Sequence, residues 1–241
     1  GEDRLLTGPE AGITRDSISV DWEYKGRSLR LYDTAGLRRK SRIEEKLEKL
    51  SVGDALRSIR FAEVVVIVFD ATIPFEKQDL QIVDLIVREG RAPVIAFNKW
   101  DLLDDDRRKY LEREIEQDLG HVAWAPRVNL SARTGRHLEK LVPAIETALE
   151  SWDTRIPTGK FNAFVAELVQ EHPHPLRGGK QPRILFGTQV QNRPPTFVLF
   201  TSGFLDPGYR RFITRRLREN YGFEGTPIQI NMRIREKRQR R

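Results

Sequence analysis

The residues best suited to chemistry form a short polar segment, Asn98-Lys99-Trp100-Asp101, directly after an apolar run. A carboxylate such as that of Asp101 can accept two hydrogen bonds from guanine, from its ring N–H and its exocyclic amine, and adenine offers no such pair. The amide of Asn98 can meet the acceptor edge of the base, and the stem of Lys99 can cover its ring. The pattern predicts guanine recognition; the alternative is a polar helix cap, with Asp101 ahead of an acidic helix start.

Three further segments have residue types that suit phosphate and magnesium chemistry. In Asp33-Thr34-Ala35-Gly36, the carboxylate can hold Mg²⁺ through water and the glycine lets a backbone N–H approach a γ-phosphate. The hydroxyl of Thr14 can reach the same ion. Ser131 and Ala132 follow another apolar run and can place backbone N–H groups beside the guanine carbonyl. For the Asp33 segment, an ordinary turn built from Asp and Gly is the alternative.

Strands and helices must position these groups. Short apolar runs rich in β-branched residues predict buried strands over 64–69, 92–97 and 127–130. Apolar residues at helical spacing predict helices over 79–88, 110–119 and 137–152. This alternation favours an α/β fold with a parallel sheet and helices on both sides. The exception is an early antiparallel hairpin, 17–23 and 28–33, expected on one edge of the sheet.

A stretch with Pro and Gly, residues 151–159, suits a linker to a second domain. The residues after it predict a small α+β unit with a helix, two strands, a helix and a final strand, over 160–171, 183–191, 196–202, 207–220 and 227–233. We therefore expect a first domain over 1–154, a second over 155–234 and a basic tail over 235–241.

Composition excludes several classes of protein. The 241 residues contain no cysteine, so disulfides, thiolate metal sites and cysteine nucleophiles are absent. No apolar run approaches the ~20 residues that span a bilayer, and the start has no signal-peptide pattern. The net charge of +7 is uneven: residues 1–156 hold 26 Lys and Arg against 29 Asp and Glu, and the remainder holds 16 against 6. The basic part predicts a polyanion partner, with a solvated tail as the alternative.

The order and spacing of the motifs resemble the translation-factor-related P-loop GTPases. Asp33 follows Thr14 by 19 residues, Asn98 follows Asp33 by 65, and Ser131 follows Asn98 by 33. The details resemble most closely Der (EngA), a family of bacterial proteins with two consecutive GTPase domains and a C-terminal KH-like domain. The resemblance runs from residue 1 to about 235 and rests on the segments 11–16, 33–40, 48–52 and 98–101.

The resemblance implies a fold and an activity. The implied fold is a P-loop GTPase fold, mostly parallel and N-terminally truncated, followed by a small α+β KH-like domain. The implied activity is hydrolysis of GTP to GDP and phosphate, used as a switch in assembling the large ribosomal subunit in the bacterial cytoplasm. The implied cofactors are GTP or GDP, Mg²⁺ and, in intact members, K⁺. The implied partners are the large subunit or its RNA and a preceding GTPase domain, with no membrane and no DNA.

The resemblance also assigns roles to residues. Thr14 would lie in switch I and hold Mg²⁺ together with Asp33, and Thr14, Gly36 and Leu37 would take the catalytic positions. Leu37 stands where Ras-like enzymes have a glutamine that orients water, and the K⁺ ion is expected to compensate. The implied nucleotide-binding residues are Asp33, Thr34, Ala35, Gly36, Leu37, Asn98, Lys99, Trp100, Asp101, Ser131 and Ala132.

The sequence departs from the family pattern in its phosphate loop. No G-x-x-x-x-G-K-[ST] segment occurs in the chain, so the phosphate cradle, its Lys and one Mg²⁺ ligand are missing. Two explanations are open: the chain is a piece of a longer GTPase, which we favour, or it acts alone and is not an enzyme. We expect the piece alone to be inactive and to bind nucleotide very weakly.

The second departure concerns RNA. KH domains bind single strands with a G-x-x-G loop between two helices, whereas the only such segment, Gly222-Phe223-Glu224-Gly225, follows the last predicted helix and carries a glutamate. The basic helix 209–218 remains a candidate contact for RNA. The alternative to an enzyme is therefore a binding module that docks RNA or protein through its KH-like domain. A metal site at His172 and His174 is not expected.

Overall fold

The computed structural model describes residues 19–24, 26–32, 59–176 and 181–235. The chain forms two compact units, 1–62 and 63–241. In the first unit, β1 (Ser19–Tyr24) and β2 (Arg27–Tyr32) pair antiparallel, with Trp22 opposite Leu29. The predicted hairpin is thus confirmed, and its place on the edge of the main sheet stays a prediction.

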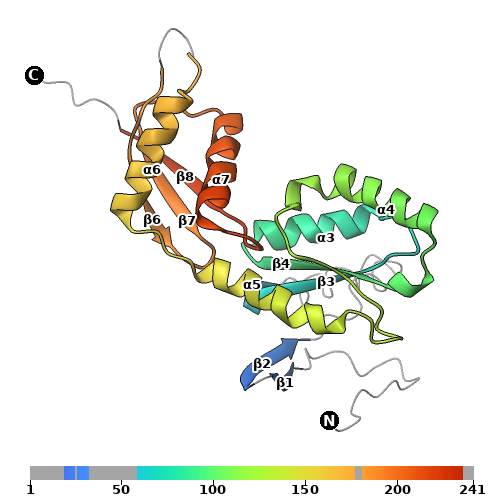
Figure 1. Cartoon of the computed structure of the whole chain (residues 1–241). Helices are drawn as coiled ribbons and strands as arrows, with labels where there is room; N and C mark the ends of the chain where they lie inside the picture. Colours follow the sequence, from blue (N-terminus) through green and yellow to red (C-terminus); the bar gives the residue numbers. More distant parts are fainter. Residues whose placement is uncertain (1–18, 25, 33–58, 177–180, 236–241) are drawn as a thin grey trace, which may run out of the picture. The chain divides into compact units, whose positions relative to one another are not determined.

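The second unit begins with the predicted parallel sheet. β3 (Val64–Asp70), β4 (Ala92–Asn98) and β5 (Arg127–Asn129) lie in the order β3-β4-β5, and both pairings are parallel. The helices α3 (Lys77–Arg88) and α4 (Asp105–Asp118) lie on one side of the sheet, and α5 (Leu141–Asp153) lies on the other (Figure 1). The α/β fold class is confirmed.

Local sequence explains where these elements lie. Residues 92–97 of β4 are buried because helices cover both faces of the central strand. α4 begins five residues before its predicted start of 110, because Asp104 caps it by accepting the backbone N–H of Arg107 at 2.7 Å. α5 begins later than predicted, because the segment after His137 forms a short 3₁₀ turn first.

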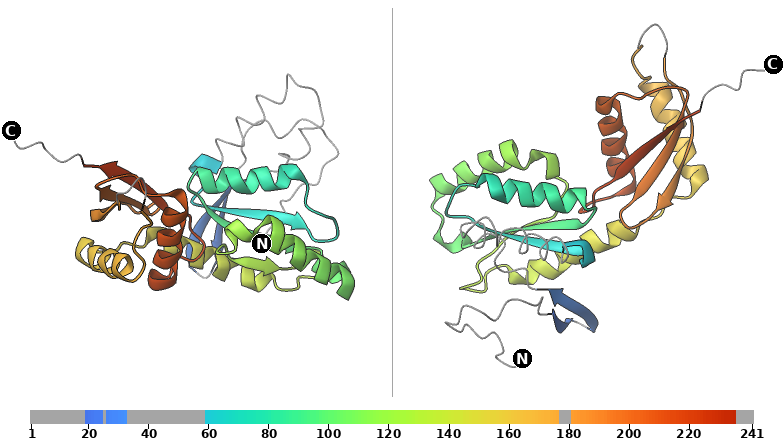
Figure 2. Two further views of the ribbon diagram at one scale, coloured as in Figure 1. Left: turned by 90° about the horizontal axis from the view of Figure 1, so that it is seen from above. Right: turned by 180° about the vertical axis from the view of Figure 1, so that it is seen from behind.

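The last part of the chain forms the predicted α+β unit. It consists of α6 (Thr158–Glu171), β6 (Ile184–Gln191), β7 (Thr196–Thr201), α7 (Pro207–Tyr221) and β8 (Gln229–Ile234). β7 is central, antiparallel to β6 and parallel to β8. Seen from above, α6 and α7 lie on the same side of the strands (Figure 2). Their buried residues, among them Phe161 and Ile213, share one core with Phe197 and Leu199 of β7.

Specific contacts join this α+β part to the parallel sheet within the second unit. The hydroxyl of Ser151, in α5, donates to the carbonyl of Gly222, directly after α7, at 3.2 Å. Arg193, between β6 and β7, binds both carboxylate oxygens of Asp153. Because residues 63–241 form one compact unit, a domain boundary near 154 stays a prediction.

The ion pair at this junction makes stability depend on pH. The hydrogen bonds from Arg193 lower the pKa of Asp153 below its ordinary value of 3.8. A carboxyl group with a lowered pKa stabilises the fold fully above its ordinary pKa, and this contribution is lost as the pH falls through the lower folded value. We expect Asp153→Asn to cost up to about 1 kcal/mol at pH 7, since the pair is half exposed. The cost should shrink below pH 3.8.

Urea unfolding at a series of pH values measures this difference. Glu150→Gln is the matched control, because it removes the same charge one turn earlier in α5 without touching Arg193. A deficit of Asp153→Asn that stays constant down to the acid end of the series would contradict the assignment.

Candidate nucleotide-binding site

The carboxyl ends of the three parallel strands bring the sequence-predicted polar residues together. Asp70 and Asn98 are register partners at the ends of β3 and β4. The backbone N–H of Leu130, after β5, donates to Phe97 at 2.9 Å, and the N–H of Trp100 donates to Leu130 at 3.1 Å. The segments 98–101 and 131–132 therefore share one edge of the sheet, the edge at which ligands bind in open α/β sheets.

Asn98 links the two segments. Its side-chain oxygen accepts the backbone N–H of Lys99 at 2.8 Å and that of Ala132 at 2.9 Å. Because the oxygen has these two donors, the amide orientation is fixed, and the side-chain NH₂ has no hydrogen-bond partner among the described residues. That NH₂ can donate to an acceptor on a ligand.

Lys99 has a backbone conformation that few residues other than glycine adopt. Its φ is 64° and its ψ is 28°, in the left-handed region. Strain of this kind costs of order 1 kcal/mol and is common at binding sites. The Lys99 ammonium binds the carboxylate of Asp70 at 2.6 Å. Burial alone would raise the pKa of Asp70, but hydrogen bonds from Lys99 and Thr72 outweigh it and lower that pKa, so the carboxylate stays ionised.

Asp101 lies opposite Arg133. Its Oδ2 accepts from the guanidinium at 2.9 Å, and its side chain is 13% exposed. Hydrogen bonding from Ser131, then from Arg133, holds the pKa of Asp101 below its usual value. An ionised Asp101 is an acceptor only, as recognition of a pair of N–H donors requires.

These groups together fit the Watson–Crick side of guanine. The carboxylate of Asp101 matches two N–H donors, the free NH₂ of Asn98 matches an acceptor, and the segment from Ser131 contributes backbone N–H groups.

Two supporting residues were not predicted from sequence, Asp70 and Arg133. Asp70 ends a predicted strand as Asn98 does, so its position at the strand end was a usable clue.

The phosphate and magnesium residues lie outside the described part of the chain. These are Thr14, Asp33, Thr34, Ala35, Gly36 and Leu37. Within the described ranges, no group of three or more His, Asp and Glu residues is arranged to hold a metal ion. His172 and His174 lie within these ranges and belong to no such group.

The Gly222–Gly225 turn has a structural partner. The backbone N–H of Gly225 donates to the carbonyl of Trp124 at 2.9 Å, and a Cβ on Gly225 would lie 2.8 Å from Ala148. The turn therefore packs against the segment before β5. An RNA contact of the KH type at this turn is not compatible with that packing.

Comparison with known proteins identifies both parts of the chain. Residues 1–99 match a family model described as 50S ribosome-binding GTPase. Residues 155–233 match one described as KH-domain-like of EngA bacterial GTPase enzymes, C-terminal. Across 238 residues, the chain is 64% identical to GTPase Der of Leifsonia xyli and 57% identical to GTPase Der of Streptomyces coelicolor. The chain belongs to the Der (EngA) family.

The match covers the chain but not the whole of its Der relatives. It includes 99% of this chain and 50% of the Leifsonia protein, or 51% of the Streptomyces protein, so the chain spans about half the length of these relatives. A solved structure of Aquifex aeolicus Era is 18% identical, with a TM-score of 0.49 over 96% of this chain and 85% of Era, a likeness too low for a functional argument. In the described part of this Der-family chain, no helix is both long and apolar enough to cross a membrane.

Proposed function

We propose that this chain acts within a GTPase that hydrolyses GTP to GDP and phosphate as a switch in assembling the large ribosomal subunit, in the bacterial cytoplasm. The observation that carries the proposal is the meeting of Asn98, Asp101 and Ala132 at one strand edge, with an ionised acceptor and a free NH₂ donor. Membership in the Der family supports this activity, because the relatives and the matching family model are described as GTPases.

The phosphate end of the site rests on family pattern alone. We assign Thr14 and Asp33 to Mg²⁺, the N–H of Gly36 to the γ-phosphate, and Leu37 to the position beside the attacking water. Bound Mg²⁺ and K⁺ would neutralise negative charge on the phosphates. The proposed partners are ribosomal RNA of the large subunit and a preceding GTPase domain. The basic charge of residues 157–241 favours the RNA.

A fusion tests the nucleotide proposal. In it, this chain follows only the short stretch of the Leifsonia xyli relative that directly precedes the aligned residues and is expected to hold the phosphate loop. The preceding GTPase domain is left out, because it would bind and hydrolyse GTP at a site of its own. We expect the fusion to release phosphate from GTP and not from ATP, and the 241 residues alone to bind GDP more weakly than about 1 μM. A fusion that binds GDP and ADP equally well would contradict the guanine assignment. Tight GDP binding by the 241 residues alone would contradict the expected need for a phosphate loop.

The alternative is a binding module without catalysis. The packing of the Gly222–Gly225 turn disfavours one form of it, a KH-type RNA clamp, but leaves other surfaces of the KH-like part. A fusion that binds RNA but hydrolyses no GTP would favour this alternative.

A further inference from the structure

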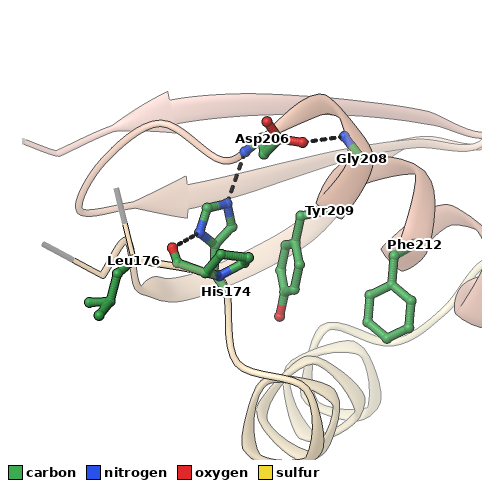
Figure 3. A pocket seen from close by; sticks show the side chains of 7 residues that line it. His174, Leu176, Asp206, Gly208, Tyr209 and Phe212 are labelled. Carbon is green, nitrogen blue, oxygen red and sulfur yellow. Dashed lines mark hydrogen bonds between the residues drawn. The ribbon is translucent and has the colours of Figure 1, made fainter. Parts of the chain in front are cut away.

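A cavity of about 470 Å³ opens in the KH-like part, away from the predicted nucleotide site. Its walls come from the segment after α6 and from the start of α7. Figure 3 shows Tyr209 and Phe212 on the same side of α7, with His174 and Leu176 beside them. The cavity is thus bounded largely by aromatic and aliphatic side chains, and a planar apolar group fits such walls.

Hydrogen bonds fix the cavity walls in place. His174 is 4% exposed, and its Nε2 accepts the backbone N–H of Asp206 at 2.9 Å. Nε2 therefore carries no proton, and Nδ1 donates to the carbonyl of Pro175 at 2.7 Å. The Tyr209 hydroxyl donates to His172 at 2.7 Å. The walls are therefore preformed, and both ring nitrogens of His174 already have hydrogen-bond partners within the protein.

Aromatic rings gather at the cavity. The ring centroids of His174 and Tyr209 are 4.9 Å apart, and those of Tyr209 and Phe212 are 5.7 Å apart. Leu176 is 74% exposed at the cavity edge. An exposed apolar side chain beside aromatic rings is accessible to a ligand, so this edge is available for a contact.

Two arginines of α7, Arg211 and Arg215, lie near the cavity wall. A guanidinium nitrogen of Arg211 lies 3.8 Å from the position that a Cβ on Gly208 would take, and Gly208 lines the cavity. The guanidinium carbon of Arg215 lies 5.8 Å from the centroid of Phe212, and its Nε lies 3.7 Å from a carboxylate oxygen of Glu219 in an exposed ion pair that a phosphate can replace. One wall carboxylate, that of Asp206, is engaged by the N–H of Gly208 at 2.7 Å. Cations placed around aromatic faces match an unpaired base with its flanking phosphates.

We propose that this cavity binds an unpaired base of single-stranded RNA, stacked against Phe212, with Arg211 and Arg215 on the adjacent phosphates. The proposal rests on the RNA partner in the proposed function and names where that RNA is held. It places the contact at the opposite end of α7 from the Gly222–Gly225 turn, whose Gly225 packs against the segment before β5. An apolar peptide would account for the walls but not for two arginines at the rim.

The test measures binding of a fluorescein-labelled, unstructured RNA of roughly ten nucleotides to the 241-residue chain, by anisotropy over a range of KCl concentrations. We expect Phe212→Leu to weaken binding about five- to 100-fold at every salt concentration, because stacking is lost and no charge is removed. Arg211→Gln should weaken binding and flatten the dependence of log Kd on log salt by a little under one. A duplex of the same sequence should not respond to Phe212→Leu.

Two controls separate stacking from other causes. Phe204→Leu changes an aromatic residue that is 44% exposed and has an arginine 5.8 Å from its ring, but does not line the cavity. It should leave Kd within about twofold of wild type. Phe212 also packs against the core, so urea unfolding checks its leucine variant. If that variant is unfolded, Arg211→Gln decides the test, because the side chain of Arg211 is exposed and its replacement should not affect folding.

Crosslinking locates the base directly. RNA that contains 5-iodouridine, irradiated in the complex and mapped by mass spectrometry, should label Tyr209 or Phe212. Labelling of Phe186 or Phe200, a stacked pair in β6 and β7, would overturn the cavity assignment and leave the RNA partner intact. If both Phe212→Leu and Arg211→Gln bind the RNA with wild-type affinity, the cavity assignment is likewise overturned. No RNA binding by the chain at all would overturn the RNA partner as well, and GTP hydrolysis by the fusion would still stand.

Discussion

Asp101→Asn is expected to change the preferred base from guanine to xanthine. An amide has one acceptor oxygen and one NH₂ donor, so it cannot accept from both N–H groups of guanine. Xanthine carries a carbonyl where guanine carries its amine, and the NH₂ of the new residue can donate to it. We expect the affinity for GTP to fall about 100- to 1,000-fold, because a charge-assisted pair is lost and an N–H group of the base is left facing a donor. Affinity for xanthosine triphosphate should rise.

Calorimetric titration of the Leifsonia fusion with GDP and xanthosine diphosphate measures this exchange. Asp106→Asn is the control, because it removes the same charge from an exposed residue in the first turn of α4. It should leave both affinities unchanged. If Asp101→Asn keeps its preference for guanine, Asp101 does not contact the base, and the site must be reassigned.

Much of the fold could be predicted because single patterns determined it. The runs 64–69 and 92–97 are apolar throughout and too short for helices, so they predict buried strands, and the structure has β3 and β4 there. Helix starts were less predictable. The apolar periodicity of α4 is weak and begins late, so its start depended on Asp104, a cap that a polar stretch with four aspartates does not single out.

The convergence of Asn98 and Ala132 was predictable from the sheet, because parallel strands end at one edge. The contacts that hold them were not. Arg133 binds Asp101 across 32 residues, and its partner depends on the path of the chain after β5. The left-handed conformation of Lys99 has no sequence cue either, because lysine does not favour it. The meeting of these two segments was thus predictable, whereas the contacts that support it required the structure; the role of the residues in binding stays a prediction.

The Gly222–Gly225 turn shows a different limit. As a sequence it resembles an RNA clamp in the wrong place, and only the structure supplies its partner. The turn is anchored by Arg218, which donates to the carbonyls of Phe223 and Thr226 and stacks 4.3 Å from the Trp124 ring. Burial lowers the pKa of Arg218 to about 10, so it stays charged at neutral pH. A partly buried cation with backbone carbonyl partners fixes the turn against the segment before β5.

Gly225→Ala is therefore expected to have a large effect on stability. Gly225 has a φ of +77°, and a Cβ there would lie 2.8 Å from the backbone of Ala148 and 2.9 Å from Pro126. The left-handed conformation costs alanine about 1 kcal/mol. The clash involves a helix backbone and a proline ring, which cannot rotate away, and adds about 1–3 kcal/mol. Urea unfolding of the 241-residue chain should show a loss of about 2–4 kcal/mol in the free energy of unfolding.

Gly222→Ala separates the two causes. Gly222 lies in the same turn with a φ of +66°, but nothing lies within 4 Å of its Cβ position. It should lose only the conformational part, about 1 kcal/mol. The difference between the two variants then measures the close approach of the turn to α5 and to Pro126. Equal losses would mean that the turn does not pack there. Pro126 directly precedes β5, which leads to Ser131 at the proposed base site. A large difference between the two losses in unfolding free energy would therefore mean that the KH-like part packs closely against the start of this strand.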